Sequence, residues 1–193
     1  MSNAVSALKG AAFSRQVAVR DAGPTGMITL RGDLGSPEFT RVLTDVTSCG
    51  MPEPRQMITQ GAISVLWMSP DELMILCSYA DAPGMTAKLA DGFGSSHTLA
   101  INVSDARTVF DLKGVPLSDV LAKLTPANLS PEALPIGEVR RTKIAQVAAG
   151  FWFTGEDSAQ LICFRSYAPY MLKLLSTAAD ENAQVGFYSA HAD

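Results

Sequence analysis

The chain has 193 residues, of which 47% are hydrophobic and 18% charged, so it can bury a sizeable core and is not a disordered chain. Its length indicates a single domain or two closely packed halves. Because the formal net charge is −4 and Lys and Arg form no run, attraction to phosphate backbones is excluded as the basis of function, and no nucleic-acid partner is expected. No stretch approaches the roughly 20 apolar residues that cross a bilayer, so no membrane partner is expected.

The three cysteines, Cys49, Cys77 and Cys163, are far apart in the sequence and form no Cys-x-x-Cys pair. Because their number is odd and the N-terminus has no apolar signal core, the sequence predicts reduced thiols in a cytoplasmic protein. Cys77 and Cys163 lie in apolar, strand-like runs, where cysteine acts as a small hydrophobe.

The first half of the chain predicts an N-terminal arm, four strands and two helices. Residues 1–15 carry no clear periodicity and are expected to be extended. A helix begins near Ser36, where an N-cap residue, a proline and a glutamate follow one another, and Gly50 with the prolines after it ends this helix. A second helix is expected from Ala82 through Leu89. The strands of this half are expected at residues 16–20, 27–31, 58–68 and 73–79.

The second half begins after a flexible link, Gly92 to Ser96, which is the expected boundary between the halves. Apolar residues at helical spacing predict a helix over Leu117 to Leu124 and a last helix after Tyr167. Three prolines place a non-regular linker at residues 126–135. The strands of this half are expected at residues 98–103, 108–112, 142–153 and 160–165.

A pattern of strand, basic residue, glycine and helix occurs twice. Leu30 and Leu112 stand 82 residues apart in its two copies, just before Arg31-Gly32 and Lys113-Gly114. Each copy is followed by a strand that carries a tryptophan, a tight turn and a return strand. The sequence therefore predicts an α+β fold of duplicated strand–strand–helix units. It forms a single domain over residues 1–193 with two pseudo-repeat halves, at about 16–92 and 97–181.

The residue types that carry common chemistries are sparse. His97 and His191 have no His or Cys partner at ligand spacing, so no metal site is predicted. There is no Gly-x-Ser-x-Gly elbow, no Gly-x-Gly-x-x-Gly fingerprint and no phosphate loop. We therefore predict no catalytic, cofactor-binding or metal-binding residue in this chain.

Two polar segments have more than one interpretation. Arg31-Gly32-Asp33 has the form of an adhesion tripeptide, but the structural interpretation is favoured, in which Gly32 turns the backbone between strand and helix; the same holds for Lys113-Gly114. Asp105 and Arg107 could form an ion pair, contact a partner or belong to an ordinary polar turn, and the turn is favoured by their spacing.

Residues 164–170 form a dense segment with Arg165, Tyr167 and Tyr170 where a strand meets a helix. Arg and Tyr are favoured anchors of protein interfaces. Both rings could equally pack on the domain's own core.

Several of these segments together resemble the gamma subunit of heterotetrameric sarcosine oxidase: residues 5–8, 66–72, 103–110, 114–121 and 165–168. That family is related to the folate-binding domain of aminomethyltransferases, a duplicated fold. The resemblance implies a complex that demethylates sarcosine to glycine with oxygen and tetrahydrofolate, releasing hydrogen peroxide and methylenetetrahydrofolate. It implies alpha, beta and delta subunits as partners, which carry FAD, FMN, NAD, tetrahydrofolate and zinc, and no cofactor in this chain.

The chain departs from the folate-dependent enzymes at one position. Those enzymes resemble one another at a Gly-Ile-x-Asp-Asp stretch, and the matching stretch here runs from Gly61 to Trp67, with Val65 and Leu66 about where the acids stand. A hydrocarbon cannot exchange a proton or support a developing cation. The sequence thus predicts a non-catalytic structural subunit; the alternatives are a stand-alone folate-dependent aminomethyltransferase and a scaffold of the same fold in another complex.

Overall fold

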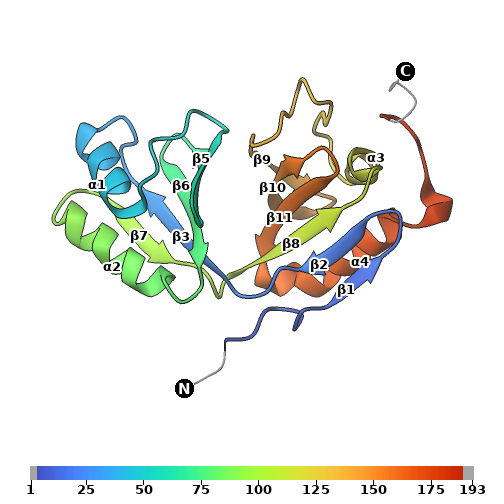
Figure 1. Cartoon of the computed structure of the whole chain (residues 1–193), viewed down its shortest axis with the longest axis horizontal. Coiled ribbons are helices and arrows are strands. Elements are labelled where there is room, and N and C mark those ends of the chain that lie inside the picture. The colour runs from blue at the N-terminus through green and yellow to red at the C-terminus, as the bar shows by residue number, and fades with distance from the viewer. Residues whose placement is uncertain (1–3, 189–193) are drawn as a thin grey trace. The chain divides into compact units, whose positions relative to one another are not determined.

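The structure, a computed structural model, describes residues 4–188 and contains two antiparallel sheets with helices on them (Figure 1). The predicted α+β class is confirmed. The chain divides into two compact units, which we call the inserted unit (Pro24–Asp105) and the terminal unit (Met1–Gly23 with Ala106–Asp193).

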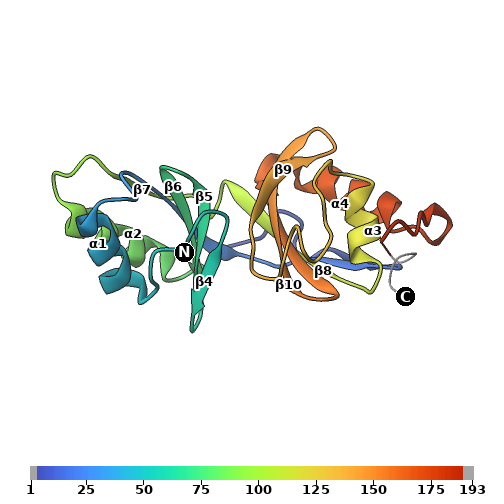
Figure 2. The same cartoon turned by 90° about the horizontal axis from the view of Figure 1, so that it is seen from above.

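The inserted unit is a five-stranded sheet with two helices on one face (Figures 1 and 2). The strand order is β4-β5-β6-β3-β7. Its strands are β3 (Thr25–Arg31), β4 (Met57–Gln60), β5 (Ile63–Ser69), β6 (Glu72–Ser78) and β7 (Leu99–Asn102), and its helices are α1 (Pro37–Thr47) and α2 (Ala82–Phe93). Its core lies between the sheet and the helices and includes Ile28, Leu30, Leu43, Val65, Ile75 and Leu89, each with no exposed surface.

Helix α1 begins where the sequence predicted, with Ser36 at the N-cap position and Pro37 in the first turn. It buries one apolar face, and the ring of Phe39 packs 5.1 Å from that of Phe93 in α2. The helix ends before Gly50, because Ser48 takes a left-handed conformation at φ 60° and its N–H donates to the carbonyl of Thr44.

The terminal unit is a six-stranded sheet with order β1-β2-β8-β11-β10-β9. Its strands are β1 (Ala12–Ser14), β2 (Ala18–Asp21), β8 (Arg107–Lys113), β9 (Arg140–Ile144), β10 (Val147–Gly155) and β11 (Ser158–Phe164). Its helices are α3 (Leu117–Ala122) and α4 (Ala168–Ala178), with short 3₁₀ turns at Arg165–Tyr167 (η1) and Glu181–Ala183 (η2). The core again lies on the helix side, around Phe110, Leu121, Phe151, Leu161, Met171 and Leu175.

The two units repeat the same order of elements. Strand β8 starts 82 residues after β3, at 107 against 25, and α4 starts 86 residues after α2, at 168 against 82. Even the irregularities recur, since the hairpins β5–β6 and β10–β11 each shift register just before the turn. The repeat read from the sequence therefore corresponds to a repeat of structure.

The structural units do not coincide with the sequence halves expected at about 16–92 and 97–181, because the first strand of each repeat is exchanged. Strand β2 opens the first repeat but pairs with β8, and β7 opens the second repeat but pairs with β3. The chain therefore passes between units after Gly23 and after Asp105. The expected link at Gly92 to Ser96 lies between the two repeats rather than between the two units, since α2 ends at Phe93 and β7 begins at Leu99. Gly92 itself lies inside α2, where a Cβ would come within 2.8 Å of Val42 in α1.

Two predicted strands are hairpins. The strand expected at 58–68 is β4 and β5, which a tight turn separates at Gly61 (φ 59°), and the strand expected at 142–153 is β9 and β10, separated at Ala145 (φ 50°). Each turn is only two residues long, Gly61-Ala62 and Ala145-Gln146, and it lies between runs of strand-forming residues, so each hairpin had the pattern of one long strand. The N-terminal arm also contains a strand, β1, which pairs with β2.

Candidate functional site

The position expected to carry acids in a folate enzyme lies in the middle of β5. Val65 and Leu66 have no exposed surface, and Val65 belongs to the core between sheet and helices. Leu66 faces the opposite side of the sheet, where its cross-strand partners are Met57 and Met74. These side chains cannot gain or lose a proton, so they cannot act as a general acid or base.

The described residues contain no cluster of side chains suited to bind a metal ion. Among residues 4–188, no group of three or more His, Cys, Asp or Glu side chains could hold a metal ion. His97 is an exposed residue in the bend between α2 and β7, and His191 lies outside the described residues. Within the described part of the chain, no helix is long and apolar enough to span a membrane.

The cysteines are buried free thiols. Burial raises the pKa of Cys163 to about 12, although the nearby Arg107 acts to lower it. Burial, and then the charge of Asp81, raise the pKa of Cys77. Both groups are protonated near neutral pH, and since the thiolate is the nucleophile, neither is poised to react.

Gly32 and Gly114 are packing residues at matching positions of the two repeats. A Cβ on Gly32 would lie 2.9 Å from the Phe39 ring, and one on Gly114 would lie 2.4 Å from the carbonyl oxygen of Gln16. Gly32 donates its N–H to the carbonyl of Asp71, in the turn between β5 and β6. The structural interpretation of Arg31-Gly32-Asp33 therefore holds, with close packing as the reason for glycine rather than a left-handed backbone.

Asp105 and Arg107 have different contacts. The carboxylate of Asp105 accepts a hydrogen bond of 2.9 Å from the hydroxyl of Tyr79. The guanidinium of Arg107 lies over the ring of Phe164, 5.1 Å from its centroid, a favourable cation–π distance. Asp105 ends the inserted unit, and Arg107 begins β8 of the terminal unit.

An exposed aromatic patch, Phe164, Tyr167 and Tyr170, lies where β11 leads into α4. The three side chains are 46–47% exposed, and the residues follow one another at intervals of three along the end of β11, the 3₁₀ turn η1 and the first turn of α4. None of them belongs to the core cluster of the terminal unit. Of the two interpretations of these tyrosines, the structure favours the interface anchor over the core residue.

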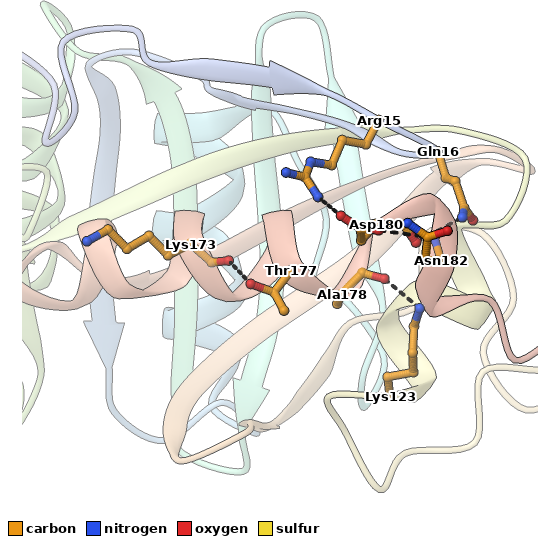
Figure 3. A network of polar contacts seen from close by, with 8 residues as sticks. All are labelled: Arg15, Gln16, Lys123, Lys173, Thr177, Ala178, Asp180 and Asn182. Carbon is orange, nitrogen blue, oxygen red and sulfur yellow. Dashed lines mark hydrogen bonds and ion pairs between the residues drawn. The ribbon is translucent and has the colours of Figure 1, made fainter.

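The helix behind this patch is fixed at both ends by the N-terminal segment. At its start, the guanidinium of Arg165 donates to the carbonyl of Val5 at 2.8 Å. At its end, Asp180 is paired with Arg15, and its carbonyl accepts from the side chain of Gln16 (Figure 3). The ammonium of Lys123 donates to the carbonyl of Ala178, where a positive charge complements the C-terminus of the helix (Figure 3).

Asp21 organises the N-terminal segment that makes these contacts. Its side chain is buried in β2, where its Oδ2 accepts from the N–H groups of Leu8 and Gly10 and its Oδ1 from that of Gly23. Burial acts to raise the pKa of Asp21, but hydrogen bonds from the Ser6 hydroxyl and these three N–H groups outweigh it and hold the pKa below its usual value. Sequence analysis did not find this role, because most of the donors are backbone N–H groups of an arm without a periodic pattern, and such groups have no residue signature.

A groove of about 680 Å³ crosses the terminal sheet on the face away from its helices. Arg20, Asp111 and Gln160 lie opposite one another on β2, β8 and β11. Asp111 accepts from Arg20 at 2.7 Å and from Gln160 at 3.0 Å. These three polar groups thus bond to one another across the strands. Only the strand register brings the three together, and sequence analysis missed them.

The fold defines a class of protein: a chain of the aminomethyltransferase fold, with apolar Val65 and Leu66 at the position where acids were expected in a folate-dependent enzyme. The glycine cleavage aminomethyltransferase T of Bartonella henselae has this fold, with a TM-score of 0.58, 16% identity, and coverage of 80% of this chain and 44% of that one. Residues 31–181 match the model of the sarcosine oxidase, gamma subunit family, and this chain belongs to that family.

Individual relatives agree with this assignment. The chain is 27% identical over 173 residues to the sarcosine oxidase subunit gamma of Corynebacterium sp. strain U-96, covering 88% of this chain and 82% of the relative. It is 29% identical over 154 residues to that of an Arthrobacter species, covering 78% and 68%. A chain in the solved heterotetrameric sarcosine oxidase from Corynebacterium sp. U-96 matches with a TM-score of 0.80 and 26% identity, covering 90% of this chain and 89% of that one.

Proposed function

We propose that this chain is a non-catalytic structural subunit of a heterotetrameric sarcosine oxidase, which oxidatively demethylates sarcosine to glycine with tetrahydrofolate and oxygen. The observation that carries the proposal is the match, over nine tenths of both chains, to a chain of the Corynebacterium heterotetramer. Its partners are then the alpha, beta and delta subunits in the cytoplasm. We expect FAD, FMN, NAD, tetrahydrofolate and zinc in those partners.

The non-catalytic role is supported by Val65 and Leu66. Both are fully buried among apolar neighbours in β5, so a folate amine placed against this strand would meet no acid or base from them. Folate titration by calorimetry separates this role from the alternative of a stand-alone aminomethyltransferase. The structural role predicts no heat of folate binding to the isolated chain, whereas micromolar binding would favour the transferase.

The assembly role is supported by the aromatic patch, since nearly half-exposed tyrosines on a fixed helix are suited to anchor an interface. The experiment is co-expression with the other three subunits followed by size-exclusion chromatography. The chain is expected to elute with them at micromolar concentration, and separate elution would refute the proposal.

Two variants locate the anchor. Tyr167→Ala and Tyr170→Ala are each expected to weaken assembly by about tenfold, because truncating an interface tyrosine costs on the order of 1–2 kcal/mol. Val115→Ala is the control, since Val115 is 90% exposed outside the patch. Equal assembly of all three variants would remove the patch from the interface but leave the subunit role intact.

A further inference from the structure

The four edges of the two sheets differ in how they are protected. Exposed strand edges invite pairing with other chains, and proteins protect them with charges, short strands or covering segments. The edge strand β9 carries Arg140, Arg141 and Lys143, β1 is only three residues long, and β4 ends in exposed Thr59 and Gln60. Strand β7 has the sequence Leu-Ala-Ile-Asn, with no charge and no proline.

Strand β7 also exposes apolar side chains. Leu99 is 47% and Ile101 44% exposed, and both lie on the same face because side chains alternate along a strand. Among the described residues, no strand pairs with the outer side of β7. The strand thus combines an open backbone edge with unprotected hydrophobic surface.

The equivalent strand in the other repeat shows what covers such an edge. Strand β2 occupies the place beside β8 that β7 occupies beside β3, and Ala18 precedes Leu99 by 81 residues. The outer side of β2 is paired with β1 in antiparallel register, with Phe13 opposite Val19. Phe13 packs against the core of the terminal unit. The first repeat therefore supplies a template for the missing strand.

The hydrogen-bond pattern defines which groups of β7 are available. The N–H of Val103 donates to Met27 in β3, so Ile101 and Leu99 also turn toward β3, and Ala100 and Asn102 turn outward. In the first repeat, the N–H of Asp21, the counterpart of Asn102, donates to the carbonyl of Ala11. Ala100 and Asn102 thus present the same outward groups that Val19 and Asp21 direct to β1 and to Ala11 just before it.

We propose that the outer edge of β7 receives an extended strand from a partner subunit of the oxidase, paired antiparallel as β1 is paired with β2. The inference rests on the proposed function, since it takes the occupant from the complex. The occupant is expected to have an apolar residue opposite Ala100, in the place of Phe13, and small or apolar residues opposite Leu99 and Ile101. Backbone pairing would supply affinity and the alternate side chains specificity.

Two variants of the full chain, co-expressed with the other subunits, test this edge. Ala100→Pro removes an outward N–H without removing a bond to β3, and Ile101→Lys places on the edge the kind of charge that blocks pairing. Each is expected to weaken assembly by about tenfold. For Ala100→Pro this is the upper end of the effect of one lost hydrogen bond, and for Ile101→Lys it reflects the cost of placing a charge against the incoming strand. Thr59→Pro is the matched control, because Thr59 directs its N–H outward from the opposite edge strand; it is expected to change assembly less than twofold.

Hydrogen exchange gives an independent measurement. In the complex, the amides of Ala100 and Asn102 are expected to exchange at least tenfold more slowly than in the isolated chain. If the wild-type complex forms but these amides stay unprotected and Ala100→Pro assembles normally, the edge proposal is wrong and the subunit role stands. If no complex forms, the proposed function itself fails. If the isolated chain dimerises and protects the same amides, the occupant is a second copy, which overturns the partner strand.

Discussion

Strands β2 and β7 hold equivalent positions in the two units, but their outer edges differ. Strand β1 covers β2 in the terminal unit, whereas the outer side of β7 is open among residues 4–188. The side chains follow this difference, since Arg20 on β2 has an ionic partner in Asp111, while its counterpart Ile101 is an exposed hydrocarbon. The terminal unit therefore completes its sheet with the N-terminal segment of the chain, and the inserted unit retains an edge suited to another chain.

Removal of β1 should leave the outer edge of β2 unpaired, as the outer edge of β7 is. Deletion of residues 1–14 is expected to lower the free energy of unfolding by about 3–5 kcal/mol, because several hydrogen bonds and the packing of Phe13 are lost together. The buried Asp21 would also lose its Leu8 and Gly10 donors. Urea unfolding measures the loss, and light scattering should show increased self-association. An unchanged urea midpoint would mean that β1 does not stabilise the terminal unit.

The matching glycines should differ in sensitivity. Gly114→Ala is expected to destabilise by about 2–4 kcal/mol, because the new Cβ would press on backbone atoms of Gln16 and Val17. Gly32→Ala is expected to cost about 1–2 kcal/mol, because its nearest neighbours are the side chains of Phe39 and Thr98, which can shift. Thermal unfolding of the pair gives the order, and a larger effect at Gly32 would contradict it.

Asp21→Asn tests the hydrogen bonds that join the carboxylate of Asp21 in β2 to the N-terminal arm. The counterpart of Asp21 in β7 is Asn102, which has no carboxylate. The variant is expected to lose about 1–3 kcal/mol at pH 7, since a carboxylate accepting several N–H groups is exchanged for a neutral amide. The pKa of Asp21 is lower in the folded than in the unfolded chain, so its stabilisation is present above the usual carboxyl pKa and is lost as the pH falls through the lowered value.

The comparison that checks the role of Asp21 is urea unfolding of the wild type and the Asn variant between pH 7 and pH 3. Their difference in stability should shrink toward acid pH. A difference that stays constant over this range would show that the charge of Asp21 does not stabilise the fold.

The smallest effect is expected where the repeats differ on the surface. Arg31 pairs with Asp71 at 2.6 Å, whereas its counterpart Lys113 has no ion-pair partner among the described residues. Hydrogen bonding from Ser69 and then from Arg31 lowers the pKa of Asp71, but the pair is exposed, and such pairs contribute little and are screened by salt. Arg31→Ala should lower the melting temperature slightly in low salt and not in high salt, and Lys113→Ala in neither.

The sequence was informative where a signal is local. The start of α1 at Ser36 and Pro37 follows from capping chemistry, and the duplication follows from a repeat of residue types. The apolar character of Val65 and Leu66 is likewise visible in the sequence without the structure. The hairpin turn at Ala145 had no such signal, because neither glycine nor proline marks it.

The sequence by itself determined the α+β class, the two repeats and the apolar residues at the acid position, since each depends on residue types and their spacing. Only the tertiary structure decided that β2 and β7 exchange units, because the sequence does not encode which of two similar sheets a short strand joins until hydrogen bonds form across it. It also decided that β2 is covered and β7 open, and that Arg20, Asp111 and Gln160 meet. Arg20 is 91 positions from Asp111 in the sequence, and Gln160 is 49 positions from it. A local pattern of residue types cannot predict contacts over such separations.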